Sequence, residues 1–445
     1  MAGKKTQAQL TPEEKLQQAL VPTAEQPYKV PANWCWTYLK NVSDCLDNFR
    51  KPINANERNA RLGDVPYYGA TGQVGWIDDY LTNEELVLLG EDGAPFLDLL
   101  KNKAYLINGK AWVNNHAHIL RSKFGTMGNR LLIEYLNSFD FTGFVTGTTR
   151  LKLTQASMNK IIIPLVPLAE QQRIVERIES LFAKLDEAKE NMQNVLEGFE
   201  TRKAAILHKA FTGELTAKWR KQHGVSMDTW EEKKLGDVTD ILSSKRIYKN
   251  EYVNEGIPFF RSSEIVDLYE YGYTEPKFFI SKDRYDEINK KYGVPEVGDL
   301  LVTSVGTIGK TWIVDERKFY YKDGNITQVK KNSSINMKYL NYFICSENFK
   351  KQVSDTVAGT AYNALTIIKF KNILISIPTL PEQTEIVRII DGLLAKEQQA
   401  NELSENALAK IDLIKKSILA RAFRGELGTN NPADEPAVEL LKRML

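Results

Sequence analysis

Two stretches of the chain repeat apolar residues in alternating steps of four and three, with polar residues between them. The first stripe comprises Ile174, Ile178, Leu181, Leu185, Ala188, Met192, Val195 and Phe199. The second comprises Ile390, Leu393, Ala400, Ala407, Ile411, Ile414 and Ile418. Such a heptad stripe keeps one face of a helix against a partner helix. The pattern therefore predicts two long helices that pair through these residues.

Both helices have recognisable ends. The segments PLVPLAEQ and IPTLPEQ precede the stripes, and proline is tolerated at a helix start because its missing N–H would be unpaired there. Gly213 and Gly425 follow the stripes and suit C-terminal caps. About forty helical residues would span about 60 Å. The second stripe weakens in its middle, where Glu397 and Ser404 take seam positions.

The helical stretches belong to a longer internal repeat. Residues 168–215 align without a gap with residues 380–427, and each pair, such as Glu170 and Glu382, lies 212 positions apart. A fainter echo pairs Trp34 with Trp230, 196 positions apart. Each half is therefore one globular piece followed by one helical piece. Antiparallel packing of the two helices as a coiled coil would give a pseudo-twofold molecule.

The globular pieces contain short β-like runs, such as ELVLLG and DLLVTS, and shorter helical stretches, such as GNRLLIEYLNSF. This mixture predicts an α+β fold. The expected order is an N-terminal extension 1–27, a first globular domain 28–167, a central helix 168–215, a linker 216–227, a second globular domain 228–379, a C-terminal helix 380–427 and a tail 428–445. The ends should be peripheral, each with one short helix.

Composition narrows the class of protein. A chain of 445 residues allows about three structural units. The net charge of +2 is near neutral, so bulk charge does not indicate nucleic acid. Three cysteines without a CxxC pair argue against a disulfide framework and a zinc site. No apolar run is long enough for a membrane span, and the N-terminus lacks the apolar core of a signal peptide. The expected location is the cytoplasm.

One short segment, SVGTIGKT at 304–311, resembles the end of a phosphate-binding loop. That loop needs an earlier glycine, where this chain has Ser304, and it needs a following helix. Here strand-like runs lie on both sides, DLLVTS before and TWIV after. The segment therefore predicts a glycine-rich hairpin rather than a nucleotide site.

Catalytic motifs were not found. The chain has no G-x-G-x-x-G, G-x-S-x-G or H-E-x-x-H pattern. It also lacks the Asn/Asp-Pro-Pro-aromatic motif with which amino-methyltransferases hold an extrahelical adenine. His116 and His118 could form an H-x-H metal pair, but no cysteine or third histidine is nearby in the sequence. Structural histidines are the better interpretation, and we predict no metal site and no catalytic residues.

Polar, glycine-rich loops are present in both globular pieces. Arginine, lysine, asparagine, glutamine, serine and threonine on such loops are the side chains that read base edges and phosphates. The candidates in the first piece are Lys51, Arg58, Arg61, Tyr67, Tyr68, Thr71, Gln73, Thr146, Thr148, Thr149 and Arg150. Those in the second are Lys245, Arg246, Arg261, Ser262, Ser304, Thr307, Lys310, Asn325, Thr360, Tyr362 and Asn363. Each loop alone is only a solvated turn, whereas two such surfaces on a twofold scaffold suggest two half-sites.

Several motifs together resemble a specificity subunit (HsdS) of a type I restriction–modification system. The duplicated EQ-x-x-IV…AF-x-GEL unit is the most specific of them, and PYYGATGQVGWID and GDLLVTSVGTIGK support it. The resemblance covers nearly the whole chain. It implies that the globular pieces are target recognition domains, each for one half of a bipartite sequence in double-stranded DNA. The helices would fix the gap between the half-sites and dock two methyltransferase subunits.

The same resemblance implies that this chain has no cofactor of its own. The partner subunits would bind S-adenosylmethionine and methylate adenine N6, and motor–nuclease subunits could join them. The chain itself would be non-catalytic, which agrees with the missing motifs. Two alternatives stay open from the residues alone. One is an enzyme that acts by itself, and the other is a scaffold that pairs two binding domains without contacting DNA.

Overall fold

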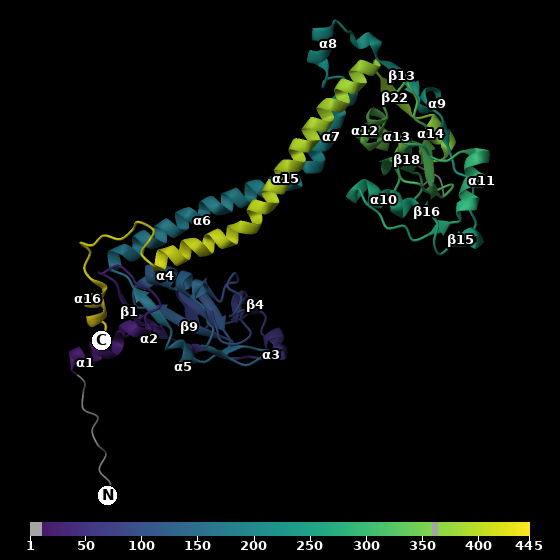
Figure 1. Ribbon diagram of the computed structural model, residues 1–445. Coiled ribbons are helices and arrows are strands. Elements are labelled where there is room, and N and C mark those ends of the chain that lie inside the picture. Colours follow the sequence, from purple (N-terminus) through teal and green to yellow (C-terminus); the bar gives the residue numbers. More distant parts are fainter. Residues whose placement is uncertain (1–10, 358–363) are drawn as a thin grey trace. The chain divides into compact units, whose positions relative to one another are not determined.

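The computed structural model describes residues 11–357 and 364–445, which fall into two compact units. The first unit runs to Met192 and includes Asn406–Leu445, and the second is Gln193–Glu405. Each unit contains one globular piece and a part of both long helices (Figure 1). Strands and helices alternate irregularly in both pieces, so the predicted α+β class is confirmed.

The first globular piece contains two four-stranded sheets. One has the order β2-β9-β6-β7, formed by Ser43–Cys45, Ala117–Ser122, Leu86–Gly90 and Ala104–Ile107. The other has the order β4-β3-β8-β5, formed by Gly72–Ile77, Val65–Gly69, Lys110–Val113 and Thr82–Asn83. The pair β3 and β8 is parallel, and the other pairs are antiparallel. Every residue of β6 is buried, which explains its unbroken apolar run.

Helices and short ribbons complete this piece. Its helices are α1 (Pro12–Ala19), α2 (Leu39–Val42), α3 (Ala55–Ala60), α4 (Gly125–Ser138) and α5 (Gln155–Met158). Helix α4 packs on β6, β7 and β9. A ribbon of β1 (Cys35–Tyr38) and β12 (Ile162–Leu165) joins the start of the domain to its end. A second ribbon pairs β10 (Val145–Thr146) with β11 (Lys152–Leu153).

The second globular piece repeats this plan. Its sheets have the orders β14-β21-β18-β19 and β15-β17-β16-β20. The strands of the first are Ile241–Leu242, Ile326–Val329, Leu300–Thr303 and Thr311–Ile313, and those of the second are Tyr252–Val253, Phe279–Ile280, Ile257–Phe260 and Tyr320–Tyr321. Again one pair, β16 and β20, is parallel. The ribbon of β13 (Glu231–Lys234) and β22 (Leu374–Ile377) corresponds to β1 and β12.

Besides its parts of the long helices, the described part of the second unit contains seven shorter helices. They are α8 (Ala217–His223), α9 (Leu235–Val238), α10 (Ser262–Tyr271), α11 (Lys282–Tyr292), α12 (Met337–Cys345), α13 (Glu347–Val357) and α14 (Ile367–Lys371). Helices α10 and α12 both pack against β19. Within the described ranges, no helix is long and apolar enough to cross a membrane.

The prediction of one uninterrupted helix over 168–215 is wrong. The structure has α6 (Leu168–Glu197) and α7 (Phe199–Phe211), with a break at Gly198. Glycine is a poor helix former because its backbone has more freedom to lose. The Arg202 guanidinium lies over this position and donates to the Val195 carbonyl at 2.7 Å, which offsets the lost helical bond. The other long helix, α15 (Leu380–Phe423), is continuous.

Packing of the long helices is antiparallel within each unit. In the first unit, Ile174 and Ile178 near the start of α6 share a core with Phe423 near the end of α15. In the second unit, Leu207 near the end of α7 shares a core with Ile390 near the start of α15. In each unit, therefore, the start of one long helix packs beside the end of the other.

The stripe predicted on the second helix is wrong at one position. The side chain of Ile414 is 44% exposed. An ideal helix has 3.6 residues per turn and drifts from a strict heptad repeat. Lys415 faces the partner helix instead: its amine bonds Asp186 at 2.6 Å and lies 5.0 Å from the ring centre of Phe182. The remaining predicted stripe residues are buried or half-buried.

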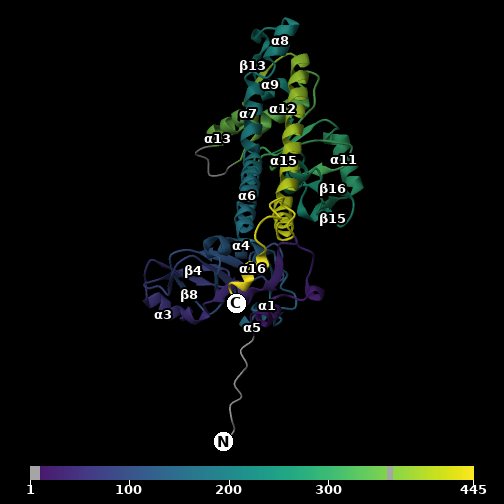
Figure 2. The same cartoon turned by 90° about the vertical axis from the view of Figure 1, so that its left-hand side faces the viewer.

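The chain's C-terminal tail was predicted to be peripheral, and this is wrong. Helix α16 (Ala437–Lys442) packs beside α1 in both views (Figures 1 and 2). Its residues Ala437 and Leu441 have no exposed surface and belong to the core of the first unit. The apolar residues of the short AVELL run thus belong to the core, because α1 packs against this helix.

The predicted linker 216–227 is also more structured than its polar sequence suggested. Its helix α8 carries Arg220, which is 8% exposed. The Arg220 guanidinium binds Glu382, the buried acid near the start of α15, at 2.6 Å. A polar residue is therefore buried here because it neutralises a buried carboxylate.

Candidate nucleic-acid interface

A face of alternating cations and aromatic rings covers the sheet β4-β3-β8-β5 of the first unit. The parallel pairing of β3 with β8 places Tyr67 opposite Trp112. Arg58 lies 5.0 Å from the Tyr67 ring centre, and Arg61 and Lys51 lie 4.7 and 5.8 Å from the Trp112 ring centre. The stacking holds the three cations close together. The structure thus brings together three candidates that span ten positions in the sequence.

Further residues belong to the same sheet and were not predicted. Lys110 lies 4.9 Å from the ring centre of Tyr80. Val74 and Trp76 on β4 are 49% and 55% exposed. For Lys110 the signal in the sequence was its spacing of two from Trp112, because residues two apart on a strand share a face. Val74 and Trp76 flank Gly75, which pairs with Tyr67, so they point to the opposite side of the sheet. We name Lys51, Arg58, Arg61, Lys110 and Tyr80, with the buried rings of Tyr67 and Trp112 beneath them, the cation–aromatic face.

The four candidate residues on the β3–β4 hairpin differ in their exposure to solvent. Thr71 and Gln73 are exposed at its tip. Tyr68 is half-buried against the Tyr105 ring. Tyr67 is only 2% exposed, so its prediction as a direct DNA contact is wrong. Alternate residues of a strand face opposite sides, and Tyr67 takes the inward side, where it supports Arg58.

The second group of candidates in the first unit lies on the loop before β11. Thr146, Thr148, Thr149 and Arg150 are exposed. Arg150 donates to Asp92 at 2.6 Å and approaches His116 at 3.3 Å. Next to Asp92, Glu91 binds both Arg50 and Lys152. The turn at Glu91–Asp92 therefore links Arg50, the neighbour of the candidate Lys51, to the candidate Arg150.

A buried cluster fixes this turn. His118 is 1% exposed, and its ring nitrogens lie 2.6 Å from Asp47 and 2.9 Å from the Leu153 carbonyl. Burial alone would raise the pKa of the Asp47 carboxyl, but the hydrogen bond and charge of His118 hold that pKa below its usual value. Likewise, burial would raise the pKa of Glu91, but hydrogen bonds from Arg50 and Lys152 outweigh it and lower that pKa.

This cluster also contains the one arrangement of potential metal ligands within the described residues. Cys45, Asp47 and His118 offer ligand atoms within 4.8 Å of one another. Both nitrogens of His118 are already engaged. Burial raises the pKa of the Cys45 thiol, which disfavours the thiolate that a metal needs. The donor set therefore suits a hydrogen-bonded cluster better than metal ligation.

In the second unit, a loop at residues 322–325 is the meeting point of the candidates. Arg246 donates to Asp323 at 2.8 Å. The Ser262 hydroxyl and the Ser304 amide both donate to the Asn325 carbonyl, at 3.4 and 2.8 Å. Three segments that are far apart in sequence thus converge on one loop.

Cations of this unit also stack on aromatic rings. Arg261 lies 4.3 Å from the Phe278 ring centre, and Lys245 lies 5.3 Å from that of Tyr292. The Lys245 amide donates to the Tyr320 hydroxyl at 2.7 Å. Tyr248 and Tyr292 are 62% and 53% exposed and were not predicted. The second unit therefore has its own cation–aromatic surface, on the sheet that corresponds to β4-β3-β8-β5.

The SVGTIGKT segment forms the predicted hairpin turn between β18 and β19. Ser304 is 3% exposed and bonds Thr327 at 2.5 Å, so its prediction as a DNA contact is wrong. Its hydroxyl is needed inside the sheet to pair with another buried hydroxyl. Lys310 binds Glu270 at 3.0 Å and lies 4.3 Å from the Tyr269 ring centre. Thr307 is exposed at the tip.

Three candidates, Thr360, Tyr362 and Asn363, lie outside the described residues. Apart from the buried Tyr67 and Ser304, the candidates of the first unit lie on the cation–aromatic face, at the β3–β4 hairpin tip and before β11. Those of the second unit lie around the loop at 322–325 and at the tip between β18 and β19, where Lys310 turns toward Glu270. These clusters offer cations, exposed aromatic rings and hydroxyls. That combination can neutralise phosphates, stack on bases and donate hydrogen bonds to base edges.

Comparison with known proteins gives an independent result. The model of the family described as "Type I restriction modification DNA specificity domain" matches twice, at residues 32–197 and 227–407. A putative type I restriction enzyme specificity subunit of Haemophilus influenzae is 31% identical over 359 residues, which is 80% of this chain and 86% of that protein. The EcoKI specificity subunit of Escherichia coli is 29% identical over 63% of this chain and 61% of its own length.

Solved structures share the fold. The HsdS subunit from Thermoanaerobacter tengcongensis matches 91% of this chain and all of its own, with a TM-score of 0.62 and 19% identity. A chain from a study of complex assembly and conformational transition of the type I R-M system matches 90% of this chain with a TM-score of 0.57, also at 19% identity. Each half of the sequence therefore has both a sequence match and a structural counterpart.

Proposed function

This chain belongs to the family of type I restriction–modification DNA specificity proteins, and from that premise we propose that each globular domain reads one half of a bipartite DNA target. The observation that carries the proposal is the repeated architecture. The family model matches each half separately, and each half has its own cation–aromatic surface on the sheet with the parallel strand pair.

The chemistry of these surfaces fits double-stranded DNA. Arginine and lysine reach guanine edges or phosphates, and glutamine pairs with adenine. In the first domain these are Lys51, Arg58 and Arg61, with Gln73 at the hairpin tip. In the second they are Lys245, Arg246 and Arg261.

The net charge of +2 is small, and affinity for DNA depends largely on phosphate neutralisation. We therefore expect tight binding only when partner subunits contribute further cations.

The proposed partners are two methyltransferase subunits, with motor–nuclease subunits as possible additions. The relatives are specificity subunits of type I restriction enzymes, and one structural neighbour comes from a study of assembly in such a system. We propose that the partners bind S-adenosylmethionine and methylate adenine N6, while this chain is non-catalytic and selects the sequence. The surfaces of α6, α7 and α15 that neither globular piece covers would dock them.

The long helices are proposed to set the gap between the half-sites. Half-sites read from one side of a duplex should be spaced by about one helical turn, about 34 Å. Inserting one heptad into both helices should change that gap in the methylated motif. An unchanged gap would disprove the spacing role but not the reading role.

The deciding experiment maps N6-methyladenine across a genome by single-molecule sequencing. Cells carry the cognate methyltransferase subunit with or without this chain. Methylation confined to one bipartite motif, and lost without the chain, is the expected result. Exchanging residues 28–167 for the corresponding segment of a relative should then alter only one half of the motif. Methylation that is absent or independent of the chain would overturn the proposal and favour a scaffold that does not read DNA.

A further inference from the structure

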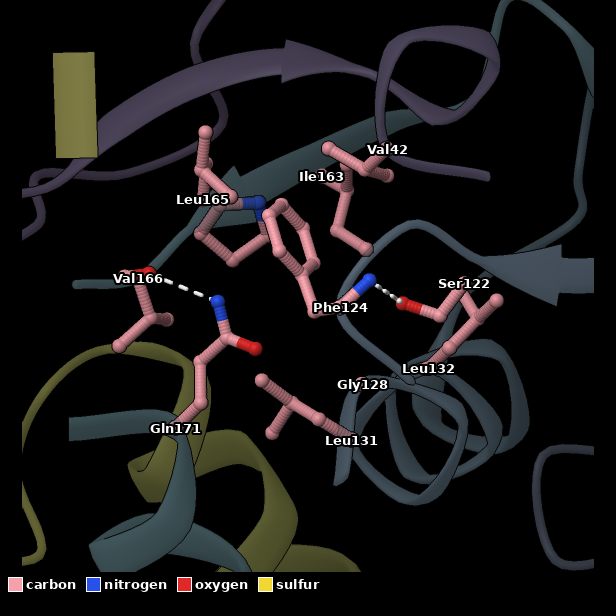
Figure 3. A pocket seen from close by; sticks show the side chains of 11 residues that line it. Val42, Ser122, Phe124, Gly128, Leu131, Leu132, Ile163, Leu165, Val166 and Gln171 are labelled. Carbon is pink, nitrogen blue, oxygen red and sulfur yellow. Dashed lines mark hydrogen bonds between the residues drawn. The ribbon is translucent and has the colours of Figure 1, made fainter. Parts of the chain in front are cut away.

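Two cavities of the first unit differ more than tenfold in size. The smaller one lies between α6, α4 and β12 (Figure 3) and has a volume of about 30 Å³, which is room for one or two waters. The buried Gln171 oxygen in it has no hydrogen-bond partner among the described residues, and a single water would satisfy it. The larger cavity has a volume of about 380 Å³, whereas about 150 Å³ is enough for a benzene ring. Only the larger cavity can therefore accept an organic ligand.

The larger cavity lies where the last turns of α15 meet the end of α4, the loop after α4, strand β12 and the segment before β1. Lys416, Ala420 and Phe423 contribute to it from one face of α15, because residues four and three apart on a helix share a face. Aromatic rings form most of its wall, and they belong to Tyr28, Tyr135, Phe139, Phe144 and Phe423. All these residues belong to the first unit.

Contacts within the chain hold the aromatic wall in place. The rings of Tyr135 and Phe423 meet edge to face, with 4.9 Å between their centres. The Tyr135 hydroxyl donates to the Ile162 carbonyl at 2.6 Å. The Phe139 ring centre lies 5.9 Å from that of Tyr135 and 5.1 Å from that of Phe144. The wall is therefore preformed, and its rings can pack against a flat apolar body.

Two cations of this lining have no acidic partner. Within the part of the chain that the structure describes, Lys416 and Arg424 make no ion pair. The Arg424 guanidinium lies 5.2 Å from the ring centre of Tyr28. Asp140 is the one acid in the described lining, and it already accepts the Thr142 N–H at 2.9 Å. Positive charge therefore exceeds negative charge around this cavity.

A third cation lies close to Lys416. Lys103 is 1% exposed, and its amine has no hydrogen-bond partner among the described residues. Burial lowers the pKa of this amine, the charge of Asp98 raises it, and the charge of Lys416 lowers it again. An anion bound beside Lys416 would offset this repulsion between two ammonium groups. The charges thus favour a ligand that carries a negative group.

The second unit does not repeat these cations. The residues 212 positions before Lys416 and Arg424 are Ala204 and Thr212, which carry no charge. The arrangement therefore occurs at one of the two equivalent places. The proposed methyltransferase partner is needed twice, and a segment of it should meet matching surfaces in both units. A free molecule that binds once per chain fits this asymmetry better.

We propose that this cavity binds one small aromatic carboxylate, with its ring against Tyr135, Phe139 and Phe423 and its carboxylate beside Lys416 and Arg424. The aromatic wall removes the ring from water, and the two cations donate charge-assisted hydrogen bonds to the carboxylate. A neutral molecule of the same shape would gain only the first of these contributions. The inference does not depend on the reading of DNA.

Cinnamate is the probe that tests the proposal, and cinnamamide, which has nearly the same shape but no charge, is its control. Saturation-transfer NMR on the full-length chain measures the binding of both. Cinnamate should bind at submillimolar concentration, and cinnamamide should bind at least tenfold more weakly. Absence of cinnamate binding at millimolar concentration, or equal binding of both probes, would overturn the proposal.

Variants locate the site. Lys416→Ala combined with Arg424→Thr introduces the residues of the second unit and should weaken cinnamate binding at least tenfold without changing that of cinnamamide. Lys410→Ala, an exposed cation on the same helix, is its control. Ala420→Phe fills the cavity from an exposed position and should abolish binding of both probes, whereas the matched change His208→Phe in the second unit should not. Full cinnamate binding by the folded Ala420→Phe chain or by the double variant would disprove the assignment.

The source of the ligand is tested by repeating the cinnamate titration on the chain assembled with its methyltransferase partner. Retained binding is the expected result. Loss of cinnamate binding on assembly would show that a partner side chain occupies the cavity, and the proposal of a free ligand would be wrong. Neither result depends on DNA recognition, so the cavity and the proposed function can fail independently.

Discussion

Two buried carboxylates, Glu170 and Glu382, occupy the same position at the start of the long helices, yet they are neutralised differently. Both have no exposed surface, and both accept the indole N–H of the repeated tryptophan, at 2.7 Å from Trp34 and 3.1 Å from Trp230. Each therefore ties a globular domain to its helix by the same bond. What differs is the segment that supplies the remaining donors.

In the first unit the donors are neutral. Asn430 and Thr429 of the C-terminal tail donate to Glu170 at 2.8 and 3.2 Å. In the second unit Arg220 donates to Glu382 at 2.6 Å, and Thr216 donates at 2.7 Å. In both units the donors come from the segment that follows the other long helix. The repeat thus fixes the position of the buried carboxylate, whereas the residues that donate hydrogen bonds to it differ between the two units.

The largest expected effect comes from breaking one pair and not the other. Glu382→Gln leaves the Arg220 charge buried without a counterion and should cost about 3–5 kcal/mol of unfolding free energy in the second unit. Glu170→Gln leaves only neutral donors and should cost about 1–3 kcal/mol in the first. Urea unfolding followed by hydrogen exchange, with peptides from each unit read separately, measures both. Exposed Glu187→Gln is the control, and equal losses at the two positions would contradict the role of Arg220.

The next largest effect should be on DNA binding, where substitutions in the two domains should affect different half-sites. Arg58→Ala removes a cation of the first domain and Arg246→Ala one of the second. Each should weaken binding of the assembled complex by about 1–3 kcal/mol if the side chain reads a base, with relaxed specificity in one half-site only. A phosphate contact would instead weaken all sequences alike and lower the salt dependence by about one ion.

Binding assays on targets altered in one half-site at a time distinguish these cases. Lys160→Ala, an exposed cation outside the long helices and the candidate contacts, is the control and should change neither affinity nor specificity. If Arg58→Ala and Arg246→Ala affected the same half-site, the assignment of one half-site to each domain would be wrong.

A smaller effect should appear in acid, in the stability of the first unit. The carboxyl pKa values of Asp47 and Glu91 lie below their usual values in the folded protein. A lowered folded pKa stabilises the fold above the ordinary pKa, and this stabilisation is lost as pH falls through the folded pKa. The unfolding free energy of the first unit should therefore fall below about pH 4. Asp47→Asn should flatten this dependence and leave the second unit unchanged; an unaltered slope would contradict the cluster's contribution.

The smallest expected effect compares the broken helix with the continuous one. Gly392→Ala on α15 meets no neighbour within 4 Å and should stabilise by about 0.5–1 kcal/mol, because alanine loses less backbone freedom. Gly198→Ala should gain less or lose stability, since a Cβ there would lie 2.3 Å from the Arg202 guanidinium. Urea unfolding measures both. Equal gains would show that Arg202 does not hold the break in place.

Much of the plan could be predicted from sequence because it is periodic or duplicated. Heptad steps depend only on helix geometry, so the long helices and their antiparallel pairing within each unit were foreseen. The SVGTIGKT hairpin was foreseen because strand-like runs flank it. Gly213 and Gly425 have positive φ values of 79° and 72°, as expected for helix caps. Each of these depends on neighbours in the chain and not on distant partners.

Other features depended on distant partners and could not be foreseen. Whether a polar residue is exposed or buried is decided by what covers it, so Tyr67 and Ser304 seemed like contacts for DNA and proved to be internal supports. The tail was predicted to be peripheral and residues 216–227 to be a linker, because the sequence does not show the buried carboxylates that they satisfy.

The sequence by itself determined that the molecule is built twice from a domain and a helix, because repeats and periods are local properties. Only the tertiary structure decided which cations share a face and which donors reach Glu170 and Glu382. These are pairings between residues far apart in the chain. They follow from burial, which obliges each polar group to find a partner in three dimensions.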